Sequence, residues 1–265
     1  MEVIRINKTN IFAYEIGLVK NPTLKEFMGK AIEALPDYFF EVAASSSGKY
    51  HPMYATGEGG LVRHTKAAVK FAYELLQLEQ NQELFDADMR DMIVIALTLH
   101  DGAKHGIPMQ KFCVADHPVV VSKYLQEQES LKGIIPQEQL DTICSLIESH
   151  MGQWNTEWGK DKEIMPKPKT PGQKFVHMCD YLASRKWLPV DFEGNEYRPE
   201  KEKADESLAA RINEIIELCR AKVADGADRA SLYGIIKDNN RGNRQPNSIP
   251  DIATADRIYK LLKGE

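Results

Sequence analysis

Cysteine is scarce in this chain of 265 residues, and its spacing excludes two common uses. The four cysteines, Cys113, Cys144, Cys179 and Cys219, contain no C-x-x-C pair of the kind that zinc-binding and thioredoxin-like motifs require. Three of them lie on predicted helical faces, where a buried and reduced thiol is the expected state. We therefore expect a cytoplasmic protein and no disulfide scaffold.

Long hydrophobic runs and an excess of positive charge are also missing. No segment reaches the roughly 20 apolar residues of a membrane-spanning helix. The opening MEVIRINKTNIF contains neither an apolar stretch nor a small-residue cleavage site. We expect no membrane partner. The formal net charge is −5, so no overall basic surface indicates a duplex-binding protein, and phosphate contacts must be local or made through metal.

A phosphate-binding P-loop is excluded, although residues 45–49 form the string SSSGK. That motif needs a glycine at position 43 and a serine or threonine at position 50, where this chain has Ala43 and Tyr50. Residues 42–60 are loop-like in composition. Two interpretations are open for this loop. Its backbone amides hold a phosphate next to a helix N-terminus, with Lys49, His51 and Tyr54 as further donors, or the segment is a plain connection.

What the sequence does contain is helical periodicity with ligand-type side chains set into it. Residues at i, i+3, i+4 and i+7 share one helical face. Each of five polar residues shares such a face with apolar neighbours: His64, His100, His117, His150 and Asp180. The face of Asp180, for instance, includes Val176, Ala183 and Trp187. The pattern predicts an all-α fold in which five helices offer these side chains to one interior.

Taken singly, each histidine is explained as a core residue bonded to a backbone carbonyl. As a set, with Asp101 directly after His100, these residues would need several separate partners if no metal were present. Imidazole and carboxylate ligands suit iron, manganese, cobalt, nickel or zinc without choosing among them. The sequence therefore predicts a site for transition metals.

The same residues carry a family resemblance. Their order and the strings GGLVRHT, LHDGAKHG, ADHP, IESHMGQW and HMCDYLASR resemble the HD-domain superfamily of metal-dependent phosphohydrolases over about residues 55–190. GGLVRHT is similar to the opening of the HD module in certain bacterial 3′ to 5′ exoribonucleases, and the whole chain resembles HD proteins of phages and prophages. The resemblance implies that His64, His100, Asp101 and Asp180 bind one metal.

It also implies a second metal. His117 and His150 match the extra pair of dinuclear members, in which Asp101 bridges two ions and a water or hydroxide between them is the nucleophile. The resemblance places the ammonium of Lys104 at the scissile phosphate, whereas the alternative is a cation at a helix end. Arg185 either contacts a phosphate or caps its helix.

Composition divides the chain into three parts. Residues 1–55 form an N-terminal segment, extended over 1–20, then a helix from Asn21-Pro22 to about Leu35 and a loop on the substrate side. Residues 56–190 form the HD domain. Residues 191–265 form a helical C-terminal extension that follows a polar boundary segment and contains a locally basic loop with Lys237, Arg241 and Arg244.

Two further features lie beside the predicted site. Trp154 and Trp158, with the run IMPKPKTPGQK, form a loop between His150 and the Asp180 helix. Two interpretations are open: nucleic-acid bases stack on these rings, or the loop is an ordinary lid packed by its tryptophans. His177, three residues before Asp180, either orients that carboxylate or occupies a core or rim position.

These observations predict an enzyme that cleaves a phosphoester of a nucleotide or single-stranded nucleic acid by a metal-activated water. Six ligand-type side chains exceed what one ion takes from protein, so two divalent transition-metal ions are expected. A mixed-valent diiron oxygenase of the same superfamily, or a nucleotide-binding regulator without turnover, are the alternatives. The substrate and the oligomeric state are not determined by the sequence.

Overall fold

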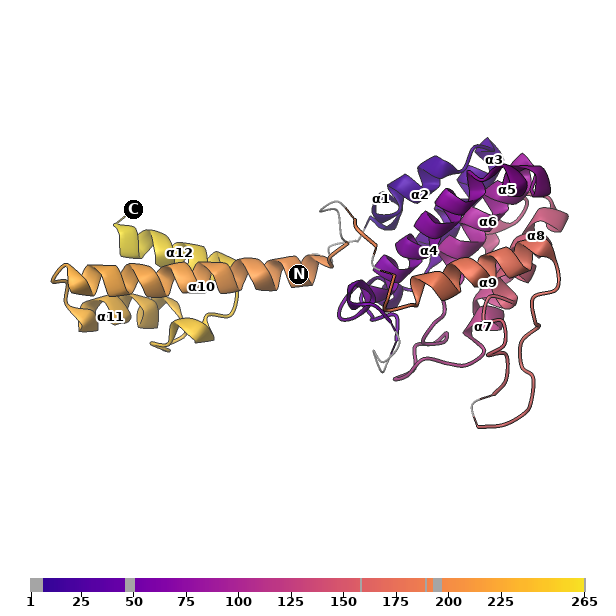
Figure 1. The fold of residues 1–265 in the computed structure, drawn as a ribbon. Helices are drawn as coiled ribbons and strands as arrows, with labels where there is room; N and C mark the ends of the chain where they lie inside the picture. The colour runs from indigo at the N-terminus through magenta and orange to yellow at the C-terminus, as the bar shows by residue number, and fades with distance from the viewer. Residues whose placement is uncertain (1–6, 46–50, 158, 189, 193–196, 265) are drawn as a thin grey trace. The chain divides into compact units, whose positions relative to one another are not determined.

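The computed structural model describes residues 7–45, 51–157, 159–188, 190–192 and 197–264, and of residues 200–206 only the backbone (Figure 1). Every named element in these ranges is an α-helix or a 3-10 helix, and no strand forms there. The predicted all-α class is confirmed. The chain separates into two compact units, Met1–Tyr197 and Arg198–Glu265.

The described part of the N-terminal segment, from residue 7 onward, is mainly helical, so the prediction of an extended segment was wrong there. Two short helices, α1 (Lys8–Ile11) and α2 (Ala13–Leu18), flank Phe12, which is fully buried. The side chain of Asn7 accepts a hydrogen bond from the backbone of Asn10 and so caps α1. Burial of an aromatic ring between the helices outweighs the weak local preference for extended backbone.

Helix α3 (Pro22–Ala34) begins as predicted, with Asn21 as its cap and Pro22 in the first turn. Its start is tied to α6 (Ala87–Leu99) through Asp91, which is 5% exposed. The Asp91 carboxylate accepts from the backbone N–H of Lys20 at 2.9 Å and of Asn21 at 2.7 Å. A charged acceptor of two partly buried N–H groups thus ties the start of α3 to α6.

We expect Asp91→Ala to lower the free energy of unfolding by about 2 kcal/mol, because two backbone donors lose their acceptor away from water. Urea denaturation measures this loss. Asp88→Ala is the matched control, since Asp88 accepts only from the side-chain amides of Asn21 and Gln139, which can turn to solvent. An equal loss in both variants would contradict the account.

The remaining helices of the first unit pack on α6 or on its neighbours. They are α4 (Gly60–Leu76), α5 (Glu79–Leu84), α7 (His117–Glu127), α8 (Gln137–Glu148) and α9 (Pro171–Ala183), with 3-10 turns η1 (Asp37–Phe40), η2 (Met53–Ala55) and η3 (Glu129–Leu131). Helices α4, α8 and α9 pack on α6, and α4 also packs on α9, whereas α7 packs on α8 and α5 on α4. Ile93, Ile95 and Leu97 of α6 are all fully buried. The C-terminal part of α6, residues 92–99, is buried all round, as expected in the centre of a bundle. The residues that follow it, His100 and Asp101, are buried too.

The second unit contains α10 (Glu200–Ala224), α11 (Arg229–Asn239), the turn η4 (Pro246–Ser248) and α12 (Ile252–Lys263). It has its own hydrophobic core, made by Ile215, Cys219, Leu232, Ile236, Ile249, Ala255, Ile258 and Leu262. The polar boundary segment predicted after Trp187, residues 188–207, overlaps the start of α10 over residues 200–207. No helix in the described ranges has the length and apolar character needed to cross a bilayer.

Candidate metal centre

Five helices bring the six predicted ligand residues to one place. His64 lies in α4, His117 begins α7, and Asp180 lies in α9. His100 and Asp101 directly follow α6, and His150 lies two residues past the end of α8. The side chains of the four histidines and Asp101 are at most 3% exposed, and that of Asp180 is 17% exposed. The cluster is therefore buried, and Asp180 is its most exposed member.

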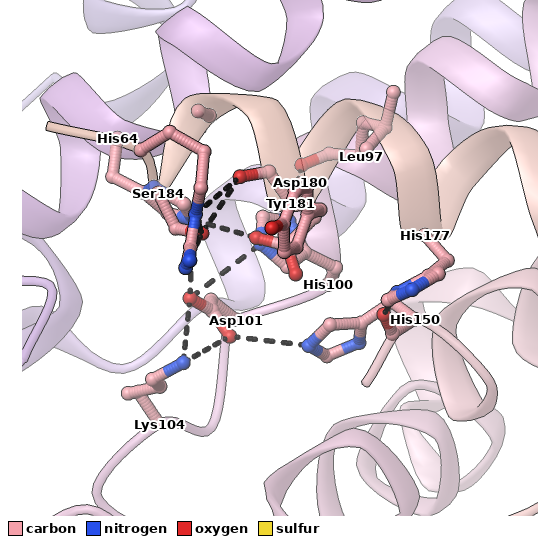
Figure 2. A network of polar contacts seen from close by, with 12 residues as sticks. His64, Leu97, His100, Asp101, Lys104, His150, His177, Asp180, Tyr181 and Ser184 are labelled. Atoms are coloured by element: carbon pink, nitrogen blue, oxygen red, sulfur yellow. Dashed lines mark hydrogen bonds and ion pairs between the residues drawn. The ribbon is translucent and has the colours of Figure 1, made fainter. Parts of the chain in front are cut away.

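The carboxylate of Asp101 lies between two pairs of histidines, of which Figure 2 labels His64, His100 and His150. Its Oδ1 is 2.9 Å from Nε2 of His117 and 3.6 Å from Nε2 of His150. Its Oδ2 is 3.5 Å from Nε2 of His100 and 3.7 Å from Nε2 of His64. Each oxygen thus faces its own pair of imidazoles, which is the arrangement expected of a carboxylate that bridges two ions.

Asp180 completes the side that contains His64 and His100. Its Oδ1 is 3.0 Å from Nε2 of His64 and 3.5 Å from Nε2 of His100. Three overlapping groups have ligand atoms within 4.8 Å of one another: His64, His100 and Asp101; His100, His150 and Asp180; and Asp101, His117 and His150. These clusters are compatible with divalent metal ions, while their number and identity are not determined by the geometry.

Backbone carbonyls fix the tautomers of three histidines. Nδ1 of His100, His117 and His150 lies 2.6, 2.8 and 2.8 Å from the carbonyl oxygen three residues earlier in each case. Because a carbonyl only accepts, Nδ1 must carry the proton, and in the neutral ring Nε2 then presents a lone pair. Hydrogen bonds of this kind orient metal-binding imidazoles. This feature was missed at the sequence level, since the spacing alone does not show the acceptors.

The resulting lone pairs face one another. Nε2 of His117 and Nε2 of His150 are 3.3 Å apart. Burial, reinforced by the ammonium of Lys104, lowers the pKa of His117 to about 4, and burial lowers the pKa of His150 as well. Both rings are therefore neutral near pH 7. Two acceptor nitrogens beside a carboxylate oxygen repel unless a cation lies among them, so the donor set fits metal ions.

The two carboxylates supply the negative charge. Burial alone would raise the pKa of Asp101, but Lys104 and His100 outweigh it and hold that pKa well below its usual range. Burial alone would also raise the pKa of Asp180, but hydrogen bonds from His100 and His64 hold that pKa well below its usual range. Burial lowers the pKa of His100, yet Asp101 and Asp180 overcome this and raise it. The centre attracts positive charge.

Lys104 contacts the ligand set directly. It lies in the turn after α6, and its side chain is 14% exposed. Its Nζ is 2.9 Å from Oδ1 and 3.0 Å from Oδ2 of Asp101, and 3.5 Å from Nε2 of His117. Burial lowers the pKa of Lys104, but the charge of Asp101 outweighs it and raises that pKa, so a permanent cation lies at the centre.

The four residues predicted to bind substrate occupy different positions. The ring of His51 lies edge-on to His64 with centroids 5.4 Å apart, and burial lowers the pKa of His51 to about 3. The hydroxyl of Tyr54 donates to the carbonyl of Ala183 at 2.8 Å, as a structural contact. Arg185 folds back to donate to the Tyr181 carbonyl and the Ser184 hydroxyl. Lys49 lies outside the described residues.

Two neighbours of Asp180 differ from expectation. His177 donates from Nδ1 to the carbonyl of His150 at 2.7 Å and therefore supports that segment and not the Asp180 carboxylate. A Cβ on Gly152 would lie 2.2 Å from the His177 ring, so only glycine fits there. Trp187 does not share the buried face, because α9 ends at Ala183, and it is 92% exposed.

Fold and site together define an all-α protein with a buried histidine and aspartate cluster suited to divalent metals. A family model, the HD domain, matches residues 59–185, and this match supports the HD superfamily for this chain. The family is typically composed of metal-dependent phosphohydrolases, which indicates metal-dependent hydrolase activity in general. No curated protein and no solved structure matches the chain. The finer likeness to exoribonuclease and phage HD modules stays a prediction.

Proposed function

We propose that this protein is a phosphohydrolase that cleaves a phosphoester of a nucleotide or single-stranded nucleic acid. His64, His100, Asp101 and Asp180 would hold one divalent transition-metal ion, and Asp101, His117 and His150 a second. The observation that carries the proposal is the position of the Asp101 carboxylate, each oxygen of which faces the imidazole nitrogens of a different pair of histidines. The neutral imidazoles of His117 and His150, beside two deprotonated carboxylates, are suited to binding cations.

When bound, the metals supply Lewis acidity, which lowers the pKa of a coordinated water and neutralises phosphate charge. The chain's own residues fix the geometry of that chemistry. The carbonyl-bonded histidines hold their Nε2 atoms toward the centre, and the buried walls exclude bulk water. Lys104 holds a permanent positive charge within 3.0 Å of Asp101, where it would stabilise charge that develops on the phosphate in the transition state.

The test separates hydrolysis from oxygen chemistry, because the same donor set serves both. We expect protein loaded with manganese under strict anaerobiosis to release phosphate or a nucleoside monophosphate from a panel of nucleotides, cyclic nucleotides and short single strands. Metal-free protein and an Asp101→Asn variant are the controls. Dependence on iron and dioxygen, with a mixed-valent paramagnetic iron pair, would replace the hydrolase by an oxygenase. Tight nucleotide binding without turnover would instead indicate a regulator.

A further inference from the structure

Two exposed aromatic rings lie stacked on segments that also carry predicted metal ligands. Trp154 and Tyr181 have ring centroids 5.9 Å apart and planes inclined by 8°. Their exposed fractions are 47% and 37%. Trp154 follows His150 by four residues, and Tyr181 directly follows Asp180. Each ring therefore belongs to a segment that carries one of the ligand residues, although 26 residues separate the rings along the chain.

Hydrogen bonds of the neighbouring residue Asn155 hold the Trp154 segment in place. Asn155 is 1% exposed, and its Nδ2 donates to the carbonyl of Met165 at 2.9 Å. The backbone N–H of Ile164 donates to the Asn155 carbonyl at 2.9 Å. Tyr181 is fixed because it lies in α9. Aromatic surface held by ordered backbone costs little conformational entropy when a ligand covers it. Here that surface is chiefly the Trp154 ring, because the Arg185 guanidinium lies over the Tyr181 ring.

His177 connects the ring pair to the centre. Its ring centroid is 6.2 Å from that of Trp154 and 6.3 Å from that of Tyr181. Its Nδ1 donates to the carbonyl of His150, and Figure 2 shows it beside that residue. The His177 side chain thus lies against both the aromatic pair and the backbone of the ligand residue His150.

A small hollow of about 280 Å³ opens beside this pair, lined by Gln153, His177, Met178 and Tyr181. The lining combines flat or polarisable surfaces with an amide and an imidazole, and it contains no carboxylate. The guanidinium of Arg185 lies over the Tyr181 ring at 4.2 Å from its centroid. Exposed aromatic groups with a few convergent polar atoms are typical of ligand sites and not of plain surface.

We propose that Trp154 and Tyr181 form a stacking platform for the nucleobase of the substrate. A nucleobase matches these observations because it has a π-face for the rings and a polar edge for Gln153 and His177. A phosphate alone would leave the aromatic surfaces unused. The inference rests on the proposed function and deepens it: the phosphoester at the metal centre would belong to a nucleotide whose base lies on this platform.

The test measures binding, so it does not require turnover. The full chain, with and without manganese, is titrated calorimetrically with the four ribonucleoside monophosphates and with ribose 5-phosphate, which lacks a base. We expect at least one nucleotide to bind about fivefold to a hundredfold more tightly than ribose 5-phosphate, the range that base stacking on an aromatic ring contributes. Trp154→Ala should remove this difference, whereas Trp154→Phe should retain most of it.

Trp187→Ala is the control, since Trp187 is an exposed tryptophan that contributes to neither the ring pair nor the hollow. Circular dichroism verifies that each variant is folded. Equal affinity of wild-type protein for ribose 5-phosphate and all four nucleotides would overturn the platform, as would full retention of the difference in Trp154→Ala. Base-dependent binding that requires Trp154, without hydrolysis of any phosphoester, would overturn the hydrolase assignment and leave the platform standing.

Discussion

Replacing Asp101 by alanine is expected to remove both metal ions and all hydrolytic activity. Asp101 is the only residue of the cluster with one oxygen toward each histidine pair, so its loss takes a ligand from both ions at once. It also removes the central negative charge that balances the cations. Elemental analysis of anaerobically purified, metal-supplemented protein should give two ions per chain in the wild type and none in the variant.

His117→Ala is the matched comparison. Of the two Asp101 oxygens, His117 faces Oδ1 and not Oδ2. This variant should therefore lose chiefly the second ion and keep the ion near His64 and His100. Asp101→Asn, which preserves the shape of the side chain, shows whether lost metal reflects lost charge or lost fold. One ion or none in the wild type would contradict the dinuclear assignment, and so would an Asp101→Ala protein that retains either ion.

Replacing Lys104 by alanine is expected to spare the metal content and to lower turnover at least about tenfold. The Lys104 ammonium is a charge-stabilising group, and such groups act on the transition state more than on the ground state. Without it, Asp101 loses a counter-charge at 2.9 Å. Bound metal restores that balance, so the variant should remain metal-loaded. Steady-state kinetics with parallel elemental analysis measure both quantities.

Lys111→Ala is the control for Lys104, because Lys111 belongs to the same connection between α6 and α7 but is exposed. It should leave turnover unchanged. If Lys104→Ala also turned over at the wild-type rate, Lys104 would be a cation at a helix end without a part in the reaction. If Lys104→Ala lost its metal, the ammonium would serve the ligand set and not the phosphate.

The sequence periodicity predicted the structure correctly wherever the burial of a single helical face determined it. The apolar positions around His64, His100 and His150 predicted helices with inward imidazoles, and the structure buries those side chains. The cap at Asn21 and the proline after it located the start of α3. The all-α class followed from the same periodicity, because a spacing of three and four residues has no counterpart in a strand.

Local pattern failed where contacts distant in sequence outweighed it. Residues 8–18 form two helices because Phe12 is buried in the core, including against Phe39 and Phe40. Trp187 was assigned to a buried face that ends before it, at Ala183. Tyr54 and Arg185 have the chemistry of phosphate donors, yet their polar groups bond to the end of α9. Residue type alone does not show which partner is within reach.

The sequence by itself determined the chemistry available to this protein: histidines and aspartates at helical spacing, cysteines without the C-x-x-C spacing of a thiolate site, and no excess of basic charge. Only the tertiary structure decided how that chemistry is arranged. The packing of α4, α6, α7, α8 and α9 set the two sides of Asp101, and the carbonyls behind the histidines set their tautomers. The stack of Trp154 on Tyr181 arose in the same way. Periodicity is a property of one helix, whereas distances between side chains depend on how several helices pack, and no single segment encodes that.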